Sequence, residues 1–149
     1  MISVKVALLS ELELLAPLFE AYRAFYGKSS ETRACKDFLK ERIKKQESVI
    51  FLAYWEQQAV GFVQLYPLFS STRLQRLWLL NDLYVAAEYR QKKVGTQLIQ
   101  KAQQHSLQTR AAGLLLETEK NNLPGNRLYP KMGFALDREH NYYFWDTPY

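Results

Sequence analysis

The feature that most constrains the fold is a strand, helix and strand pattern in the second half of the chain. Residues Arg76–Val85 (RLWLLNDLYV) are nearly all apolar except Asn81 and Asp82, which predicts a long buried strand. A helix pattern over Val94–Thr109 and a short apolar run over Leu114–Thr118 follow. Two strands joined through a helix lie parallel in a sheet, and parallel sheets bind ligands at the carboxyl ends of their strands. The sequence therefore predicts a βαβ unit with a site beyond the end of the long strand.

Helices and an antiparallel pair of strands are predicted for the first half of the chain. The elements expected there are a strand at 2–8, a helix from the capping box Ser10-x-x-Glu13 to Gly27 with a kink or a preceding turn at Pro17, a helix from Ser29 or Ser30 to about Gln46, and strands at Val49–Trp55 and Val60–Tyr66. The elements expected later are a loop at Pro67–Thr72, a short helix at Asn126–Lys131 and a last strand at Tyr142–Trp145. We therefore predict one α/β domain over residues 1–149, with a mixed, mostly antiparallel central sheet that contains the parallel βαβ unit and is flanked by helices.

Composition restricts the partners. The formal charge of +5 favours anionic ligands, but the basic residues are scattered except at Arg90–Lys93, and no nucleic-acid-reading module is present, so no nucleic-acid partner is expected. One cysteine, Cys35, and two distant histidines predict neither a disulfide nor a metal site. No apolar run is long enough to span a membrane, and the cytoplasm is the expected location.

A basic turn separates the long strand from the following helix. The first turn of a helix offers free N–H groups and the positive end of the helix dipole, so it binds anions. A pyrophosphate would fit here, while an ordinary solvated turn is the alternative interpretation. The residues expected at such a phosphate are Arg90, Gln91, Lys92, Lys93, Val94, Gly95 and Thr96.

This turn resembles the central motif of the GNAT superfamily of N-acetyltransferases, R/Q-x-x-G-x-G/A, which binds the pyrophosphate of CoA. Arg90 and Gly95 match the motif, and the preceding LNDLYV and Glu88-Tyr89 are also similar to the family pattern. Lys93 stands where the family usually has glycine. A side chain there would be strained if φ must be positive, so we expect weakened rather than abolished CoA binding.

A second segment resembles the same family independently. Residues 122–134 are similar to the family's N-x-x-A-x-x-L-Y-x-x-x-G-F, with Gly125 in place of the common alanine. The positions in register are Asn122, Leu128, Tyr129, Gly133 and Phe134. The two motifs, in order and at a suitable distance, identify the chain as resembling GNAT enzymes over about residues 77–134.

The resemblance implies acetyl-CoA as the acyl donor and assigns several residues to it. Tyr129 would protonate the thiolate leaving group. The pantetheine arm would pair with the backbone of Leu83, Tyr84 and Val85, as if it were an added strand. Asn122 would touch CoA, cap the following helix or do both. Asn126 is placed with the cofactor-binding residues.

The chemistry of the acceptor points to carboxylates. The amine must lose a proton before it attacks, and no Ser-His-Asp or Cys-His arrangement is evident, which favours direct transfer in a ternary complex. Asp82 and Glu117 lie at comparable ends of neighbouring predicted strands, where either would accept that proton or bind a cationic substrate; structural roles are the alternatives. Asn81 stands where some relatives have glutamate and cannot act as a base.

Aromatic residues suggest a small primary amine as the acceptor. We expect Tyr22, Tyr26 and Asn81 to join Asp82 and Glu117 in binding it, with further aromatic surface from Tyr66, Phe69 and Trp78 unless these rings are core. A peptide or protein amine is the second candidate, and a CoA-binding sensor without activity is a third. The aromatic C-terminal segment (NYYFW) is either an exposed edge or an interface of a homodimer.

Overall fold

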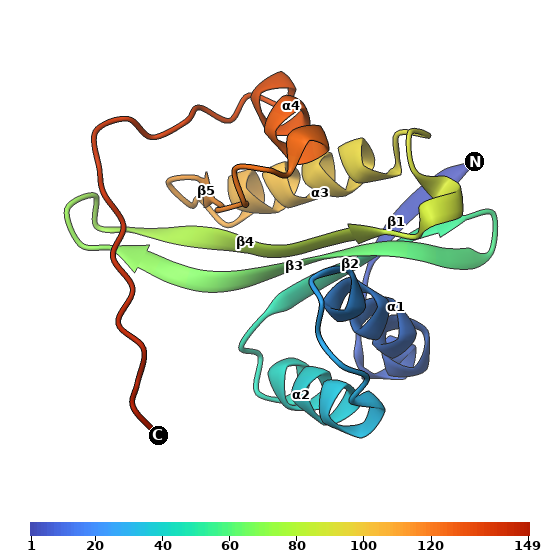
Figure 1. Ribbon diagram of the computed structural model, residues 1–149. Helices are drawn as coiled ribbons and strands as arrows, with labels where there is room; N and C mark the ends of the chain where they lie inside the picture. The colour runs from blue at the N-terminus through green and yellow to red at the C-terminus, as the bar shows by residue number, and fades with distance from the viewer. The chain divides into compact units, whose positions relative to one another are not determined.

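The computed structural model describes residues 1–149, which divide into two compact units, residues 1–117 and 118–149. The first unit contains one five-stranded sheet in the order β1-β2-β3-β4-β5 (Figure 1). All neighbouring strands are antiparallel except β4 and β5, which are parallel and joined through α3. Its elements are β1 (Ile2–Val6), η1 (Leu9–Glu11), α1 (Leu12–Phe25), α2 (Thr32–Lys44), β2 (Val49–Trp55), β3 (Gln58–Ser70), β4 (Gln75–Val85), η2 (Ala87–Tyr89), α3 (Val94–Gln108) and β5 (Leu114–Leu115). The predicted fold class, a mixed sheet with a parallel βαβ unit and flanking helices, is confirmed.

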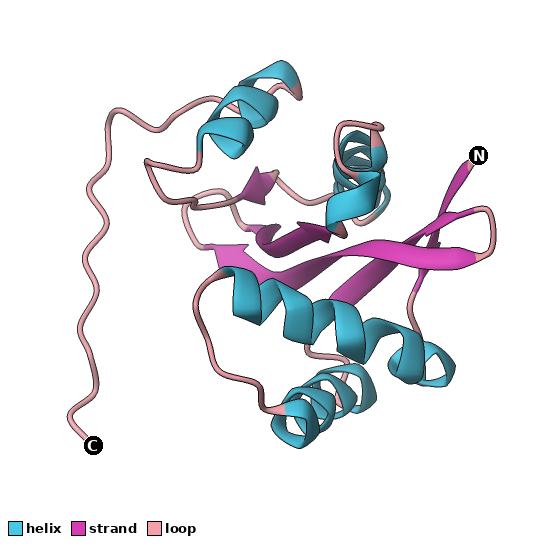
Figure 2. Ribbon diagram, turned by 45° about the vertical axis from the view of Figure 1, so that its right-hand side comes forward, coloured by secondary structure: helices cyan, strands magenta, loops and turns pink.

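Helices cover both faces of this sheet. Figure 2 shows α3 on one face and the pair α1 and α2 on the other. On the α1 face, Leu15 and Phe19 of α1 and Leu39 of α2 belong to one buried cluster with Leu52 of β2 and Phe62 of β3. On the other face, α3 packs on β2, β3 and β4. Both layers bury apolar side chains, so the central strands are apolar on both faces.

The ladder between β3 and β4 contains a bulge at Asn81. Gln64 lies opposite Asp82 and Leu65 lies opposite Leu80, so Asn81 is an extra residue on β4. An extra residue reverses the alternation of side chains beyond it. Before the bulge, Trp78 contacts His105 of α3, whereas six residues later Tyr84 contacts Tyr22 of α1. Because of the bulge, the Tyr84 side chain therefore points to the α1 face of the sheet, whereas the Trp78 side chain points to the α3 face.

β5 pairs with only a short part of β4. Trp78 lies opposite Leu114 and Leu79 opposite Leu115, where the pairing ends. Within residues 1–117, the remaining six residues of β4, 80–85, therefore have β3 on one side and no strand on the other. The carboxyl end of β4 thus keeps a free row of backbone hydrogen-bonding groups.

The second unit consists of α4 (Leu123–Lys131) and the residues that flank it. Asn122 caps α4 because its side chain accepts a hydrogen bond from the Gly125 N–H at 3.3 Å. Residues after the helix form no further helix or strand, and Figure 1 shows them as an extended chain.

Three local predictions were wrong. The first helix is preceded by the turn η1, and Glu11 rather than Glu13 accepts from the chain before it, through the Leu8 N–H at 2.7 Å. Residues 67–70, expected in a loop, belong to β3. Pro67 is tolerated because β2 begins at Val49, opposite Leu65, so that the rest of β3 has no neighbour on that side. The last predicted strand, Tyr142–Trp145, is not formed, because no neighbouring strand pairs with it.

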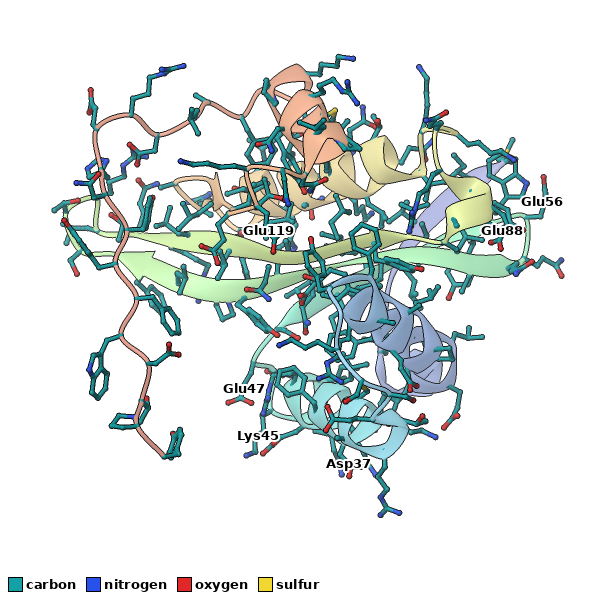
Figure 3. All side chains as sticks on the ribbon, viewed as in Figure 1. Asp37, Lys45, Glu47, Glu56, Glu88 and Glu119 are labelled. Atoms are coloured by element: carbon teal, nitrogen blue, oxygen red, sulfur yellow. The ribbon has the colours of Figure 1, made fainter.

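The charged residues are spread over solvated surfaces. Asp37, Lys45 and Glu47 are exposed on or beside α2 and point away from the sheet (Figure 3). No helix of the structure combines the length and the apolarity that a membrane span needs.

Gly61 on β3 is required by a close approach of β4, and this leads to a first prediction. A Cβ atom at position 61 would lie 2.7 Å from the backbone oxygen of Tyr84, which cannot move without disturbing the sheet. We expect Gly61→Ala to lower the free energy of unfolding by about 1–3 kcal/mol, as overpacking does. The measurement is urea denaturation. The control is Gly113→Ala, whose Cβ would meet nothing within 4 Å; equal effects of the two changes would contradict the prediction.

Candidate functional site

A buried carboxylate lies at the bulge of β4. Asp82 is 5% exposed, and its Oδ2 atom accepts a hydrogen bond from Gln64 Nε2 at 2.6 Å. Its Oδ1 atom accepts from Asn81 Nδ2 at 3.0 Å. Both donors are neutral amides, so they orient the carboxylate without neutralising its charge. No basic side chain forms an ion pair with it. The arrangement suits a group that accepts a proton or binds a cation.

Burial controls the ionisation of this cluster. Desolvation raises the pKa of Asp82, and hydrogen bonds from Gln64, Tyr22 and Asn81 oppose that rise. Burial, and then the negative charge of Asp82, raise the pKa of Tyr66 to about 12. Tyr66 therefore stays a neutral hydroxyl beside the carboxylate at physiological pH.

Sequence reasoning missed Gln64. Its side chain is completely buried, and its carbonyl oxygen Oε1 has no hydrogen-bond partner. A buried acceptor without a partner costs about 1–3 kcal/mol, so the amide gives up one interaction to donate to Asp82. The one signal in the sequence was the amide side chain of Gln64 within an otherwise apolar run of β3. That Gln64 lies opposite Asp82 follows only from the bulge, which the structure shows.

Aromatic rings of α1 lie next to the same bulge. The Tyr22 hydroxyl donates to the backbone oxygen of Asn81 at 3.4 Å. The Tyr22 ring lies 5.1 Å from Tyr26 and 6.3 Å from Tyr84, between ring centroids. The predicted substrate-binding residues Tyr22, Tyr26, Asn81 and Asp82 are thus brought together on the α1 face of the sheet.

Two of the other proposed aromatic residues, Trp78 and Phe69, are not part of this group. Trp78 is buried on the α3 face, where its ring lies 4.7 Å from that of His105 and its indole N–H donates to Thr109 Oγ1 at 2.9 Å. It is a core residue, the alternative that the sequence left open. Phe69 is 74% exposed near the far end of β3, with the Arg76 guanidinium over its ring.

Glu117 lies two residues beyond β5, on the carboxyl side of that strand, and is exposed. The pairing of β5 with β4 ends at Leu115, before Glu117. The two predicted carboxylates therefore differ in environment, since Asp82 is buried and hydrogen-bonded and Glu117 is exposed to solvent. A role for Glu117 stays a prediction.

The basic turn adopts the strained backbone that the sequence comparison anticipated. Lys93 is the N-cap of α3 with φ +70° and ψ +13°, and Gln91 also has a positive φ, +60°. Such left-handed conformations are uncommon for residues other than glycine. Lys93 therefore occupies the one backbone conformation in which a motif glycine would be favourable.

The start of α3 fits an anion. No side chain caps its first turn, and no acidic residue lies in that turn. The N–H groups of Val94, Gly95 and Thr96 therefore lack the usual capping partner at the positive end of the dipole. Lys92 and Lys93 add charge beside them, although the Lys92 ammonium also lies 5.4 Å from the Trp55 ring.

Arg90 links the turn to the end of β4. Its Nε donates to the backbone oxygen of Val85 at 2.8 Å, and its guanidinium lies 5.5 Å from the Tyr84 ring and 5.3 Å from the Phe25 ring. The side chain is exposed, so it holds the turn against the strand while its remaining N–H groups face solvent.

The second unit holds the other predicted residues. Tyr129 lies on α4, half-buried, with its ring 5.8 Å from that of Phe134. The Asn126 amide donates to the backbone oxygens of Glu119, Lys120 and Asn122, so its NH₂ group is used within the loop. A Cβ atom at Gly125 would lie 2.5 Å from Asn122 Nδ2, which explains glycine where the family commonly has alanine.

Comparison with known proteins agrees with this geometry. The sequence profile of the acetyltransferase (GNAT) family matches residues 15–134. The chain belongs to the GNAT acetyltransferases. An uncharacterized N-acetyltransferase of Bacillus subtilis is 36% identical to this GNAT chain, over 98% of each. The crystal structure of a probable acetyltransferase superimposes with a TM-score of 0.94 at 40% identity, over 98% of each chain. A streptothricin acetyltransferase of Escherichia coli is 27% identical, over 83% of this chain and 70% of that protein.

The buried carboxylate of this GNAT chain predicts a pH-dependent stability. Because the pKa of Asp82 is raised above its ordinary value of 3.8, ionisation favours the unfolded chain, and the contribution of the group is lost as the pH rises through its folded pKa. We expect Asp82→Asn to gain stability relative to the unsubstituted protein as the pH rises from 3.8 to the folded pKa of Asp82, by at most about 1.4 kcal/mol per pH unit, and to gain no more above it.

Urea denaturation across pH measures this difference. Asp137→Asn is the matched control: hydrogen bonds from the Glu139 backbone and the His140 side chain lower the pKa of Asp137, so that variant should lose relative stability as the pH rises. Parallel pH profiles for the two variants would contradict the opposite pKa shifts of Asp82 and Asp137.

The left-handed backbone of Lys93 in the GNAT motif also predicts a change in stability. Left-handed backbone costs a side-chain-bearing residue about 1–2 kcal/mol, and glycine costs about 0.5–1 kcal/mol in chain entropy. Lys93→Gly should therefore raise the free energy of unfolding by about 0.5–1 kcal/mol. Lys92→Gly, which removes the same charge at a position without positive φ, should lower it. Thermal and urea denaturation of the pair test the prediction, and a loss in both would overturn it.

Proposed function

We propose that this GNAT acetyltransferase moves the acetyl group of acetyl-CoA onto a primary amine of a small molecule, by direct transfer within one catalytic domain over residues 1–149. The observation that carries the proposal is the Asp82 carboxylate, buried at the bulge and oriented on both oxygens by neutral donors. Its position beside Tyr22 and at the free end of β4 puts a proton acceptor next to a row of unpaired backbone groups.

The acceptor amine would bind first as an ammonium ion at this carboxylate. Its pKa is near 10 in simple amines, so it must lose a proton before it can attack. Asp82 would hold that proton on Oδ1 or Oδ2, directly or through a water. Because the pKa of Asp82 is raised, it lies closer to the pKa of the amine, which favours transfer of the proton from the amine to the carboxylate. The rings of Tyr22 and Tyr26 would contact the cation through their faces, and Asn81 and Gln64 act as positioning residues.

Acetyl-CoA, when bound, would supply the acetyl group as an activated thioester. The residues present fit such a donor at two places. The uncapped start of α3 with Arg90, Gln91, Lys92 and Lys93 would bind its pyrophosphate. The free edge of β4 at Leu83, Tyr84 and Val85 would pair with its amide-bearing arm, because a strand edge without a neighbour satisfies its hydrogen bonds in this way.

Tyr129 is the proposed acid for the departing thiolate. A thiol has a pKa near 8.5, so the thiolate leaves more readily when it receives a proton. The hydroxyl group of a tyrosine can donate that proton. Asn122, which caps α4, would help to fix the helix that carries Tyr129. Asn126 would support the same loop through its three hydrogen bonds and would contact the donor with its remaining oxygen.

A small amine is favoured over a protein amine by the burial of the carboxylate. The Asp82 side chain of β4 lies below the surface, hydrogen-bonded to Gln64 of β3 and Tyr22 of α1, where a slender ammonium group reaches it more readily than a folded chain. The streptothricin acetyltransferase relative acts, by its name, on a small molecule, which supports the same substrate class here.

The experiment is thiol release from acetyl-CoA with a panel of polyamines, amino acids, aminoglycosides and peptides. We expect turnover with one class of small amine and a loss of 10-fold or more in Tyr129→Phe, since a proton donor is removed. Tyr54→Phe, a change of the same kind on β2, a strand to which we assign no site residue, is the control and should keep its rate. Equal rates in the two variants would remove Tyr129 from the mechanism.

Two further outcomes of the panel decide between the alternatives. Peptides as the preferred acceptors would replace the small-molecule assignment. Tight CoA binding without turnover on any amine would overturn the assignment of enzymatic activity and favour a CoA-binding sensor. Asp82→Asn is run beside the panel, and an undiminished rate in that variant would exclude the carboxylate as the base.

A further inference from the structure

The hydrogen bonds around Asp82 suit an ionised carboxylate and leave a protonated one without an acceptor. Within the first unit, residues 1–117, Oδ2 of Asp82 accepts from Gln64 Nε2 at 2.6 Å and Oδ1 accepts from Asn81 Nδ2 at 3.0 Å. An ionised carboxylate only accepts hydrogen bonds, whereas a protonated carboxyl group also has an O–H group that must donate. The inference below rests on the proposed function, in which Asp82 gains a proton in every catalytic cycle. That proton needs an acceptor beside the carboxyl group.

The buried amide of Gln64 contains such an acceptor. The side chain is completely buried, and its Oε1 atom has no hydrogen-bond partner. Nε2 of the same amide already lies 2.6 Å from Asp82 Oδ2. A half-turn of the terminal amide exchanges Oε1 and Nε2, and it needs little repacking because the two ends of an amide are nearly alike in size and shape. After that half-turn, Oε1 would lie beside Asp82 Oδ2 and accept its O–H group.

The rest of the fold favours neither orientation of this amide strongly. In the present orientation, the carbonyl oxygen of Gln64 is buried without a donor. In the rotated orientation, an N–H group would take its place and be buried without an acceptor. Each orientation leaves one end of the amide unsatisfied, at a similar cost. The hydrogen bond to Asp82 therefore decides between them, because an ionised carboxylate selects the Nε2 end and a protonated carboxyl group selects the Oε1 end.

We propose that the Gln64 amide is a two-position switch that follows the proton on Asp82. When an N–H bond of the bound ammonium ion breaks, its electron pair stays on the nitrogen as the nucleophilic lone pair, and the proton forms an O–H bond with Asp82 Oδ2. The amide then rotates, and Oε1 accepts that O–H group. Release of the proton to solvent returns the amide to its first orientation. Gln64 is thus a positioning residue that stabilises both protonation states of the base, so that the proton stays on Asp82 while the amine attacks.

The other titratable groups around the carboxylate come from α1, α2 and β3. Burial and the charge of Asp82 raise the pKa of Tyr66 on β3 to about 12, against a smaller opposite effect of Arg42 on α2. Tyr66 therefore stays a neutral hydroxyl. The Tyr22 hydroxyl of α1 hydrogen-bonds Asp82. A hydroxyl can accept as well as donate, so Tyr22 is the competing acceptor for the proton, and the test must separate it from Gln64.

The first test follows the Gln64 amide by NMR in the isotope-labelled, ligand-free, full-length protein. Nuclear Overhauser effects between the amide protons of Gln64 and the Cβ protons of Asp82 report which end of the amide faces the carboxyl group. The carboxyl carbon signal of Asp82 gives the pH at which this group titrates. The Gln64 signals are those that are missing from Gln64→Met. We expect the effects above the titration midpoint of Asp82 and their loss below it, whereas an amide that only holds the carboxylate in place would keep them throughout.

The second test uses Asp82→Asn and needs no acid. The new amide satisfies both neighbours when its oxygen accepts from Asn81 and its NH₂ group donates to Gln64 Oε1. We therefore expect the rotated Gln64 amide in this variant at every pH, with no Overhauser effects to the Cβ protons of position 82. Tyr22→Phe is the matched control, because it removes the competing acceptor and should leave the pH-dependent rotation intact. Circular dichroism checks that each variant, and the unsubstituted protein at its lowest pH, is folded.

Three results would overturn the switch. These are Overhauser effects that persist through the titration of Asp82, an Asp82→Asn variant in which the Gln64 NH₂ group still faces position 82, or loss of the rotation in Tyr22→Phe. None of these measurements uses acetyl-CoA or an amine, so they are separate from the test of the proposed function. Turnover of an amine without rotation would remove the switch and keep the activity, and rotation without turnover would do the reverse.

Discussion

The candidate site depends on one extra residue in one strand. Without the bulge at Asn81, strict alternation would place Asp82 on the same face as Trp78, among the apolar residues under α3. With it, Asp82 turns toward Tyr22 and lies opposite Gln64. The bulge thus moves a carboxylate from a core where it could not be tolerated to a layer where donors and aromatic rings surround it.

The positions to which we assign function also carry features that destabilise the fold. Asp82 is desolvated without a cationic partner, Gln64 keeps a buried carbonyl without a donor, and Lys93 adopts a left-handed conformation. Each feature costs on the order of 1–3 kcal/mol on its own. Left-handed backbone also occurs at Gln46, Glu56, Leu74 and Arg110, so this region is distinguished by the combination of all three features at the end of one strand and at the turn that follows it.

The sequence predicted elements that are defined by local pattern. The strand Val49–Trp55 has the bounds expected, because an apolar run ends there at a polar turn, and the helix after the basic turn begins at Val94 as expected. The bulge was not predictable, since Asn81 reads as an ordinary strand residue until its partner strand is known. Gln64 was missed for the same reason. Pro67 indicated a loop because sequence alone does not tell an edge from an interior strand.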